Sequence, residues 1–277
     1  MNSQVILSVR NYAQHFPINK SLTVRAVNGI SFDLRKGEIF GLVGESGCGK
    51  STVARAVMGI HTPTEGEIFF KDYLLSEKRS YREHRKDIQR NMQVIFQDSA
   101  AALNPRMKVA DIIAEPLVIN RLFPDKAQRR AEVDKLLTLV GLDTSYGNKF
   151  PGEISGGQRQ RVAIARSIAV NPELIVADEP VASLDVSIQA QIVSLFQHLQ
   201  REHRFTFLFI AHDLSMVRYI CDRVGVMYAG KLVELAPAEE LFATPLHPYT
   251  RALLSAIPVP DPLYERSKPI IPYTHET

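Results

Sequence analysis

Residues 44–51, with the sequence GESGCGKS, constrain the fold and chemistry of this chain more than any other segment. They match the pattern G-x-x-x-x-G-K-[ST], follow the strand-like run IFGLV and precede a helix-like stretch over residues 52–58. Glycines in such a loop let backbone N–H groups converge on phosphate oxygens, and the next helix adds the positive end of its dipole. A chance match is expected in roughly one such chain in a hundred. The segment therefore predicts a loop that binds the phosphates of a nucleotide.

The residue types in this loop predict separate roles. Lys50 is expected to reach the β/γ-phosphates and Ser51 to bind Mg²⁺. A bulky adduct on the Cys48 thiol is expected to obstruct the phosphates. The other residues expected to bind the nucleotide are Gly44, Glu45, Ser46, Gly47, Gly49 and Thr52.

The loop by itself leaves kinases, GTPases, helicases and motor ATPases open, so a second element is needed. The apolar run LIVA ends in Asp178 and Glu179, far enough from Lys50 for a subdomain to be inserted between them. Asp178 is expected to hold magnesium through water. Glu179 is expected to orient the water that attacks the γ-phosphate, or to accept its proton.

Hydrophobic periodicity predicts an α/β fold with a mostly parallel sheet. The first third is β-rich, residues 127–140 have the period of an amphipathic helix, and strands alternate with helices from residue 174 to residue 228. The charge-dense stretch EKRSYREHRKDIQR mixes both signs, which is typical of a solvated helix face rather than a nucleic-acid site. From about Ala236 prolines recur, and we interpret this tail as an appendage.

Composition excludes several classes of protein. Hydrophobic residues at 45% and charged residues at 23% are ordinary for a globular chain, and a net charge of +3 names no nucleic acid or membrane surface as partner. Two cysteines, Cys48 and Cys221, favour a reducing compartment over a disulfide framework. We find no signal peptide and no apolar run of about 18 residues. If the protein acts at a membrane, we therefore expect it to bind at the membrane surface.

Residues 154–161, ISGGQRQR, resemble the signature sequence of ATP-binding cassette (ABC) ATPases. A Ser-Gly-Gly turn at a helix start presents a hydroxyl and bare N–H groups to an anion. In that family the anion is the γ-phosphate held by the other subunit of a head-to-tail dimer, which implies nucleotide contacts for Ser155, Gly157 and Gln158. Ile154 replaces the usual leucine, a departure expected to change packing rather than chemistry.

Further family elements follow in the expected order, and the resemblance implies their roles. Gln97, in VIFQD, resembles the glutamine that reaches magnesium and the attacking water and links the site to a membrane partner. Ser183-Leu184-Asp185 resembles the loop that crosses the dimer interface. His212 resembles the switch histidine that contacts the γ-phosphate and positions the catalytic glutamate.

The resemblance also implies the architecture, a P-loop NTPase (RecA-like) core with an antiparallel β subdomain and an inserted α-helical subdomain. Residues 1–235 are expected to form the nucleotide-binding domain, with the helical subdomain at about 98–166, and residues 236–277 a proline-rich extension. Phe16 stands where the family places an aromatic ring against adenine. Tyr12 is the competing ring, and a core role for both is the alternative.

Nearly the whole chain resembles the ATPase subunits of oligopeptide/dipeptide importers, including GLVGESGCGKST, DEPVASLDVSIQAQI and the tail LHPYTRALLSAIPVPDP. This implies an ATP-hydrolysing motor that uses ATP and Mg²⁺ at the cytoplasmic face of a prokaryotic membrane. The implied partners are a second, different ATPase subunit, two integral-membrane permease subunits and, indirectly, an extracytoplasmic solute-binding protein, with no nucleic acid. No iron–sulfur cluster is expected, because the chain has no cysteine beyond Cys221 for one near the tail.

Alternative functions stay open at this stage. The same ATPase role could serve an importer of nickel or metal chelates, or of oligosaccharides. A soluble ABC protein of DNA repair or translation would usually carry a coiled-coil insertion or two cassettes, and neither is visible. A phosphotransferase would leave ISGGQ without purpose. The tail marker His247-Pro248-Tyr249 is equally compatible with a proline-stiffened segment packed on the domain.

Overall fold

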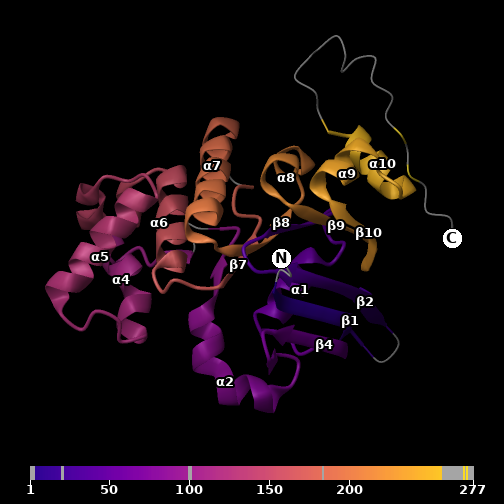
Figure 1. The fold of residues 1–277 in the computed structure, drawn as a ribbon, viewed down its shortest axis with the longest axis horizontal. Helices are drawn as coiled ribbons and strands as arrows, with labels where there is room; N and C mark the ends of the chain where they lie inside the picture. Colours follow the sequence, from indigo (N-terminus) through magenta and orange to yellow (C-terminus); the bar gives the residue numbers. More distant parts are fainter. Residues whose placement is uncertain are drawn as a thin grey trace, which may run out of the picture.

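Two β-sheets and a set of helices make up the computed structural model, which describes residues 4–19, 22–98, 102–182, 184–257, 271 and 273 (Figure 1). Within these residues, every helix is too short or too polar to cross a bilayer. The larger sheet has six strands, in the spatial order β10 (Lys231–Pro237), β9 (Arg223–Tyr228), β3 (Ile39–Val43), β8 (Thr206–Ala211), β7 (Leu174–Asp178), β6 (Met92–Ile95).

Five of these six strands run parallel, and only β10 is antiparallel to its neighbour. The mostly parallel α/β sheet predicted from periodicity is therefore confirmed. The central strands β3, β8 and β7 are almost entirely apolar and buried because both faces of the sheet are covered, as is usual for parallel sheets. In β8 all six residues are buried.

Alternation along the strands creates two separate apolar cores. Phe207 and Phe209 of β8 point into the cluster beneath the helices, whereas Leu208 and Ile210 point into the cluster shared with the second sheet. That second sheet is antiparallel, as the resemblance implied, and it packs over α1 (Lys50–Val57). Its strand order is β2 (Thr23–Arg35), β1 (Val5–Pro17), β4 (Glu65–Phe70), β5 (Tyr73–Leu74).

Helices at one end of the molecule form a separate group (Figure 1). The helix predicted over residues 127–140 is α5 (Lys126–Leu139), which packs with α4 (Val109–Ile119) and α6 (Gly156–Ile168). The charge-dense stretch forms α2 (Lys78–Asn91), in which Ile88 alone is buried. These findings agree with an inserted helical subdomain, whose boundaries stay a prediction. The other helices of the described chain are α7 (Val186–His203), α8 (Leu214–Ile220), α9 (Ala238–Ala243) and α10 (Pro248–Ser255), with 3₁₀ turns η1 (Thr144–Asn148) and η2 (Pro151–Glu153).

The start of the C-terminal extension folds onto the larger sheet. Leu241 of α9 and Tyr249 of α10 are fully buried members of the cluster beneath the helices. Two of the prolines lie at helix starts, since Pro237 caps α9 and Pro248 is the first residue of α10. Proline suits that position because its ring presets φ and the missing N–H would have no helical partner. The boundary at residue 236 stays a prediction.

Gly66, in β4, offers a test of how closely β4 approaches β1. Its φ is +84°, and a Cβ there would lie 2.3 Å from the Asn11 carbonyl oxygen and 2.5 Å from that of Arg10. We expect Gly66→Ala to destabilise the protein by at least about 2 kcal/mol, because a strained φ and a backbone clash add. For a chain of this size the melting temperature should fall by roughly 5 °C or more, measured by thermal unfolding.

Gly152→Ala is the matched control, because a Cβ there meets no heavy atom within 4 Å. If both variants have the melting temperature of the original protein, the close approach of β1 and β4 described here would be contradicted.

Candidate active site

The predicted site residues follow four adjacent parallel strands. The glycine-rich loop follows β3, His212 follows β8, Glu179 follows β7 directly after Asp178, and Gln97 follows β6. Because parallel strands present their carboxyl ends at the same edge of the sheet, these side chains gather there. The strand order β3-β8-β7-β6 thus explains why residues so far apart in sequence meet.

The loop over residues 44–51 ends at the N-terminus of α1, with Gly49 as the capping residue. Gly49 has φ +109°, and a Cβ there would lie 2.4 Å from the carbonyl oxygen of Ala26, so only glycine fits. No side chain caps α1 at this end, so its first N–H groups are left for an anion, as at other helix N-termini that bind phosphate.

Lys50 is 4% exposed and folds back over its own loop. Its Nζ donates hydrogen bonds to the carbonyl oxygens of Gly44, at 2.7 Å, and Glu45, at 2.9 Å. The Cys48 sulfur lies 3.7 Å from the same nitrogen. A buried ammonium needs such acceptors, and they hold the positive charge within the loop that is expected to receive phosphate.

Ser51 and Asp178, two of the residues predicted to hold magnesium, are hydrogen-bonded to each other. The Ser51 hydroxyl donates to Oδ1 of Asp178 at 3.2 Å. Burial raises the pKa of Asp178, with a smaller contribution from the neighbouring Glu179 charge, while the Ser51 hydrogen bond opposes both. A carboxylate and a hydroxyl, with the Gln97 amide oxygen predicted as a third ligand, are the hard oxygen donors that Mg²⁺ prefers.

Glu179 receives contacts from both sides on one carboxylate oxygen. The Gln97 amide donates to Oε2 at 3.0 Å, and the His212 Nδ1 atom lies 3.3 Å from that same oxygen. The Glu179 side chain is 16% exposed and the His212 side chain 51% exposed. The Glu179 backbone has φ +47°, an uncommon conformation for a non-glycine residue and one that collects at functional sites. The three predicted catalytic residues therefore form one cluster.

The two candidate adenine rings differ in accessibility. Tyr12 is fully buried, and its hydroxyl donates to the Gln14 side chain at 3.3 Å, so this ring lies in the core. Phe16 is half-buried near the end of β1 and packs edge-to-face against the His61 ring, with 5.5 Å between ring centroids. Of these two rings, Phe16 is the one that is accessible for stacking on a base.

The signature residues are not brought to this cluster. Ser155 is exposed and caps α6, accepting a hydrogen bond from the Gln158 N–H, while the Gln158 side chain accepts one from the Ser155 N–H. Gly157 and Gln158 line a polar cavity of about 400 Å³ with Arg161 of α6. In the described chain, none of the three makes a hydrogen bond to residues 44–52.

Gln189, in the first turn of α7, is a positioning residue that sequence reasoning missed. Gln189 donates to the carbonyl oxygens of Val181, at 3.1 Å, and Leu184, at 3.0 Å, and so braces the turn after Glu179. In the sequence, Gln189 is a polar residue in the first turn of a predicted helix, and such residues are too common to indicate a role. Asp185 precedes α7 as its N-cap residue, and Ser183 lies outside the described residues.

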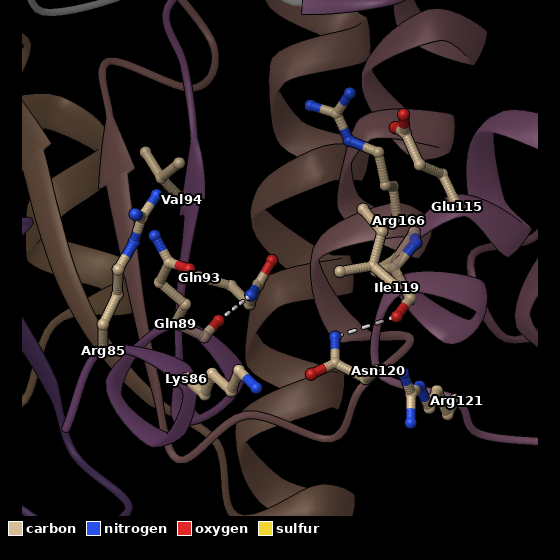
Figure 2. Close-up of a pocket in the computed structure, with 11 residues that line it drawn as sticks. Arg85, Lys86, Gln89, Gln93, Val94, Glu115, Ile119, Asn120, Arg121 and Arg166 are labelled. Atoms are coloured by element: carbon tan, nitrogen blue, oxygen red, sulfur yellow. Dashed lines mark hydrogen bonds between the residues drawn. The ribbon is translucent and has the colours of Figure 1, made fainter. Parts of the chain in front are cut away.

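A groove of about 850 Å³ separates α2 and β6 from α4, and Figure 2 shows side chains reaching into it from both walls. Arg85 and Lys86 come from α2, and the exposed Ile119 comes from the end of α4. Among the lining residues that the structure describes, cations outnumber acids: Arg121 and Arg166 add to the α2 pair, and Glu115 is the single carboxylate. Strand β6 forms part of the wall and ends two residues before Gln97.

Comparisons with known proteins agree with this geometry. A family model described as "ABC transporter" matches residues 27–182, and one described as "Oligopeptide/dipeptide transporter, C-terminal region" matches residues 233–276. The chain is 55% identical to the oligopeptide transport ATP-binding protein OppF of Bacillus subtilis, over 96% of this chain and 87% of that protein. It is 48% identical to the dipeptide transport ATP-binding protein DppF of Lactococcus lactis, over 97% and 86%.

Solved structures give the same picture. An ATP-binding cassette solved as a dimer in a post-hydrolysis state with ADP and Pi superposes with a TM-score of 0.74 at 26% identity, covering 84% of this chain and 98% of that one. CbiO1 of Clostridium perfringens, part of an ABC transporter complex, gives 0.75 at 28% identity, covering 87% and 91%.

The position of Cys48 generates a prediction about nucleotide binding. The thiol is 6% exposed, burial raises its pKa, and its sulfur lies beside Lys50. Once a maleimide has reacted there, we expect ATP binding to be lost, because the adduct occupies the space of the phosphates. Binding of a fluorescent ATP analogue to labelled protein measures this loss.

Cys48→Ala, treated with the same reagent, is the control and should keep its affinity for ATP, since reaction at Cys221 alone leaves the loop intact. Normal ATP binding by protein labelled at Cys48 would contradict the placement of the loop.

Proposed function

Because the chain belongs to the ABC transporter family, we propose that it is the ATP-hydrolysing motor subunit of a membrane importer for oligopeptides or dipeptides. The observation that carries the proposal is the meeting of Gln97 and His212 on one oxygen of Glu179, beside the Ser51–Asp178 pair. The C-terminal family match and the relatives named as peptide transport proteins support peptide cargo over metal chelates or oligosaccharides.

The geometry supports a division of labour in hydrolysis. The loop N–H groups and Lys50 neutralise the β/γ-phosphates, and Phe16 stacks on the adenine. Ser51, Asp178 and Gln97 hold Mg²⁺, which when bound offsets phosphate charge. Glu179 orients the attacking water or accepts its proton. His212 and Gln97 fix the carboxylate through Oε2, so that its other oxygen, Oε1, is left to accept a hydrogen bond from that water.

Ser155, Gly157 and Gln158 complete the site of a second subunit in this proposal. Exposure of Ser155 and the lack of bonds between these residues and the loop of the same chain support that assignment. A relative solved as a dimer with ADP and Pi supports pairing of two cassettes. ATP binding then closes the pair and hydrolysis reopens it, through different affinities for the two states.

The basic groove between α2 and α4 is where we place the membrane subunit. Its excess of cations fits an acidic cytoplasmic segment, and the exposed Ile119 adds an apolar contact. Because β6 forms part of the groove wall and ends two residues before Gln97, movement of the occupant would shift Gln97 and its hydrogen bond to Glu179. In this proposal the protein acts at the cytoplasmic face of the membrane, with permease subunits and a second ATPase as partners.

Glu179→Gln tests the catalytic assignment. The amide keeps the shape and the contacts but loses the charge, so we expect ATP to bind and turnover to fall on the order of 10³-fold or more. Because hydrolysis is what reopens the pair in this proposal, the variant should also remain a closed dimer with ATP. Phosphate release measures turnover, and size-exclusion chromatography with ATP detects the closed dimer.

Glu202→Gln, an exposed change on α7, should behave as the original protein. Lys50→Ala should instead lose nucleotide affinity. Near-normal turnover in Glu179→Gln, or unchanged ATP binding by Lys50→Ala, would overturn the corresponding role.

Reversal of charge in the groove tests the membrane partnership. We expect the Arg85→Glu, Lys86→Glu double variant to lose its membrane subunits during purification in mild detergent, as judged by mass spectrometry, while keeping its basal ATPase activity. Arg82→Glu is the control, since Arg82 is an exposed residue of α2 outside the groove.

Recovery of membrane subunits, a second ATPase and a solute-binding protein with the original chain supports the importer. Recovery of only soluble partners or nucleic acid would leave the ATPase chemistry intact but reject transport.

A further inference from the structure

A buried hydroxyl from the far end of the chain reaches the phosphate-binding loop. Tyr249, in α10, is 1% exposed, and its Oη accepts a hydrogen bond of 3.1 Å from the backbone N–H of Glu45. The proposed hydrolysis makes no use of this side chain. The contact joins the C-terminal extension directly to the loop that is proposed to hold ATP.

The peptide group between Gly44 and Glu45 is held at both of its polar ends. Its carbonyl oxygen, that of Gly44, accepts from Nζ of Lys50 at 2.7 Å, and its N–H, that of Glu45, donates to Tyr249. Gly44 has φ +149° and no side chain to restrict rotation of this peptide. The orientation of the peptide therefore depends on these two bonds. The same bonds set the direction of the Gly44 carbonyl oxygen that accepts from Lys50.

Tyr249 is itself fixed firmly enough to act as a support. The Glu234 carboxylate accepts from the N–H groups of Leu246 and His247, each at 2.9 Å, and His247 Nδ1 accepts from the Tyr249 N–H at 3.1 Å. These bonds secure the turn into α10. The Tyr249 ring packs against that of Tyr228, with centroids 4.2 Å apart. Both the backbone and the ring of Tyr249 are thus constrained.

We propose that Tyr249 is a positioning residue through which the C-terminal extension sets the Gly44–Glu45 peptide and the Lys50 ammonium for ATP. The proposal rests on the function proposed above. Loss of the hydroxyl leaves the Glu45 N–H without its partner in a part-buried loop, which is costly, so the peptide turns to find another. Lys50 then loses an acceptor of fixed direction.

Tyr249→Phe removes the hydroxyl and keeps the packed ring. We expect ATP affinity to fall about tenfold, the effect of losing one hydrogen bond that orders the loop, and KM for ATP to rise more than kcat falls. Isothermal titration and phosphate release measure these quantities. Tyr273→Phe is the matched control, because Tyr273 adds its ring to the same aromatic cluster and none of its described contacts reaches the loop.

The two cysteines supply a second readout, independent of activity. Cys48 lies in the loop and Cys221 is buried beside Gly41 of β3, so the maleimide reactivity of Cys221 reports general loosening. In nucleotide-free Tyr249→Phe we expect Cys48 to react about fivefold faster or more and Cys221 to react at its original rate, resolved by peptide mass spectrometry. Glu234→Gln, which weakens the turn into α10, should act in the same direction to a smaller extent.

Three results separate the possible failures. Equal Cys48 reactivity and ATP affinity in Tyr249→Phe and Tyr273→Phe would overturn the positioning role. Acceleration of both cysteines together would overturn it too, since the tyrosine would then only stabilise the fold. An original protein that neither binds nor hydrolyses ATP would reject the proposed function, whereas the labelling experiment would still decide whether Tyr249 orders the loop.

Discussion

The six-stranded sheet is covered on both faces, and each face accepts one set of side chains. Phenylalanines of β8 fill the helical side and aliphatic residues fill the other, so a slip of one residue would exchange the two sets. This packing fixes the register, which pairs Val43 with Ala211 and Asp178 with Ile210 at the edge of the sheet. The distances among Gln97, Glu179 and His212 follow from that register, because each of these residues directly follows or lies close after a strand end.

Much of this arrangement could be predicted from local patterns. The loop is continuous in sequence, and the strand before Asp178 is an uninterrupted apolar run, so both were recognisable without tertiary information. Helix α5 was recognisable from its periodicity. The meeting of Gln97, His212 and Glu179 required the family resemblance, since no short pattern shows which strands will be neighbours. The roles assigned to these residues remain predictions that geometry supports.

Other features depend on contacts that sequence patterns do not carry. Helix α4 contains Pro116, a residue that argues against a helix interior, and tertiary packing of its apolar face outweighs that preference. Prolines in the tail suggested stiff turns, whereas Pro248 begins a helix that brings Tyr249 to the loop. Gln189 braces the turn after Glu179 by donating to two carbonyl groups. These carbonyl groups come within reach of the amide only when the turn is folded, so the sequence alone does not show the contact.

The contact between Tyr249 and Glu45 spans 204 positions of the chain. During synthesis the glycine-rich loop leaves the ribosome long before the helix that supports it, so a growing chain carries a recognisable but unfinished phosphate cradle. Truncated products, which lack α10, would present the loop without its support. If Tyr249 has the role proposed above, the order of the elements along the chain therefore delays completion of the cradle until α10 has been made.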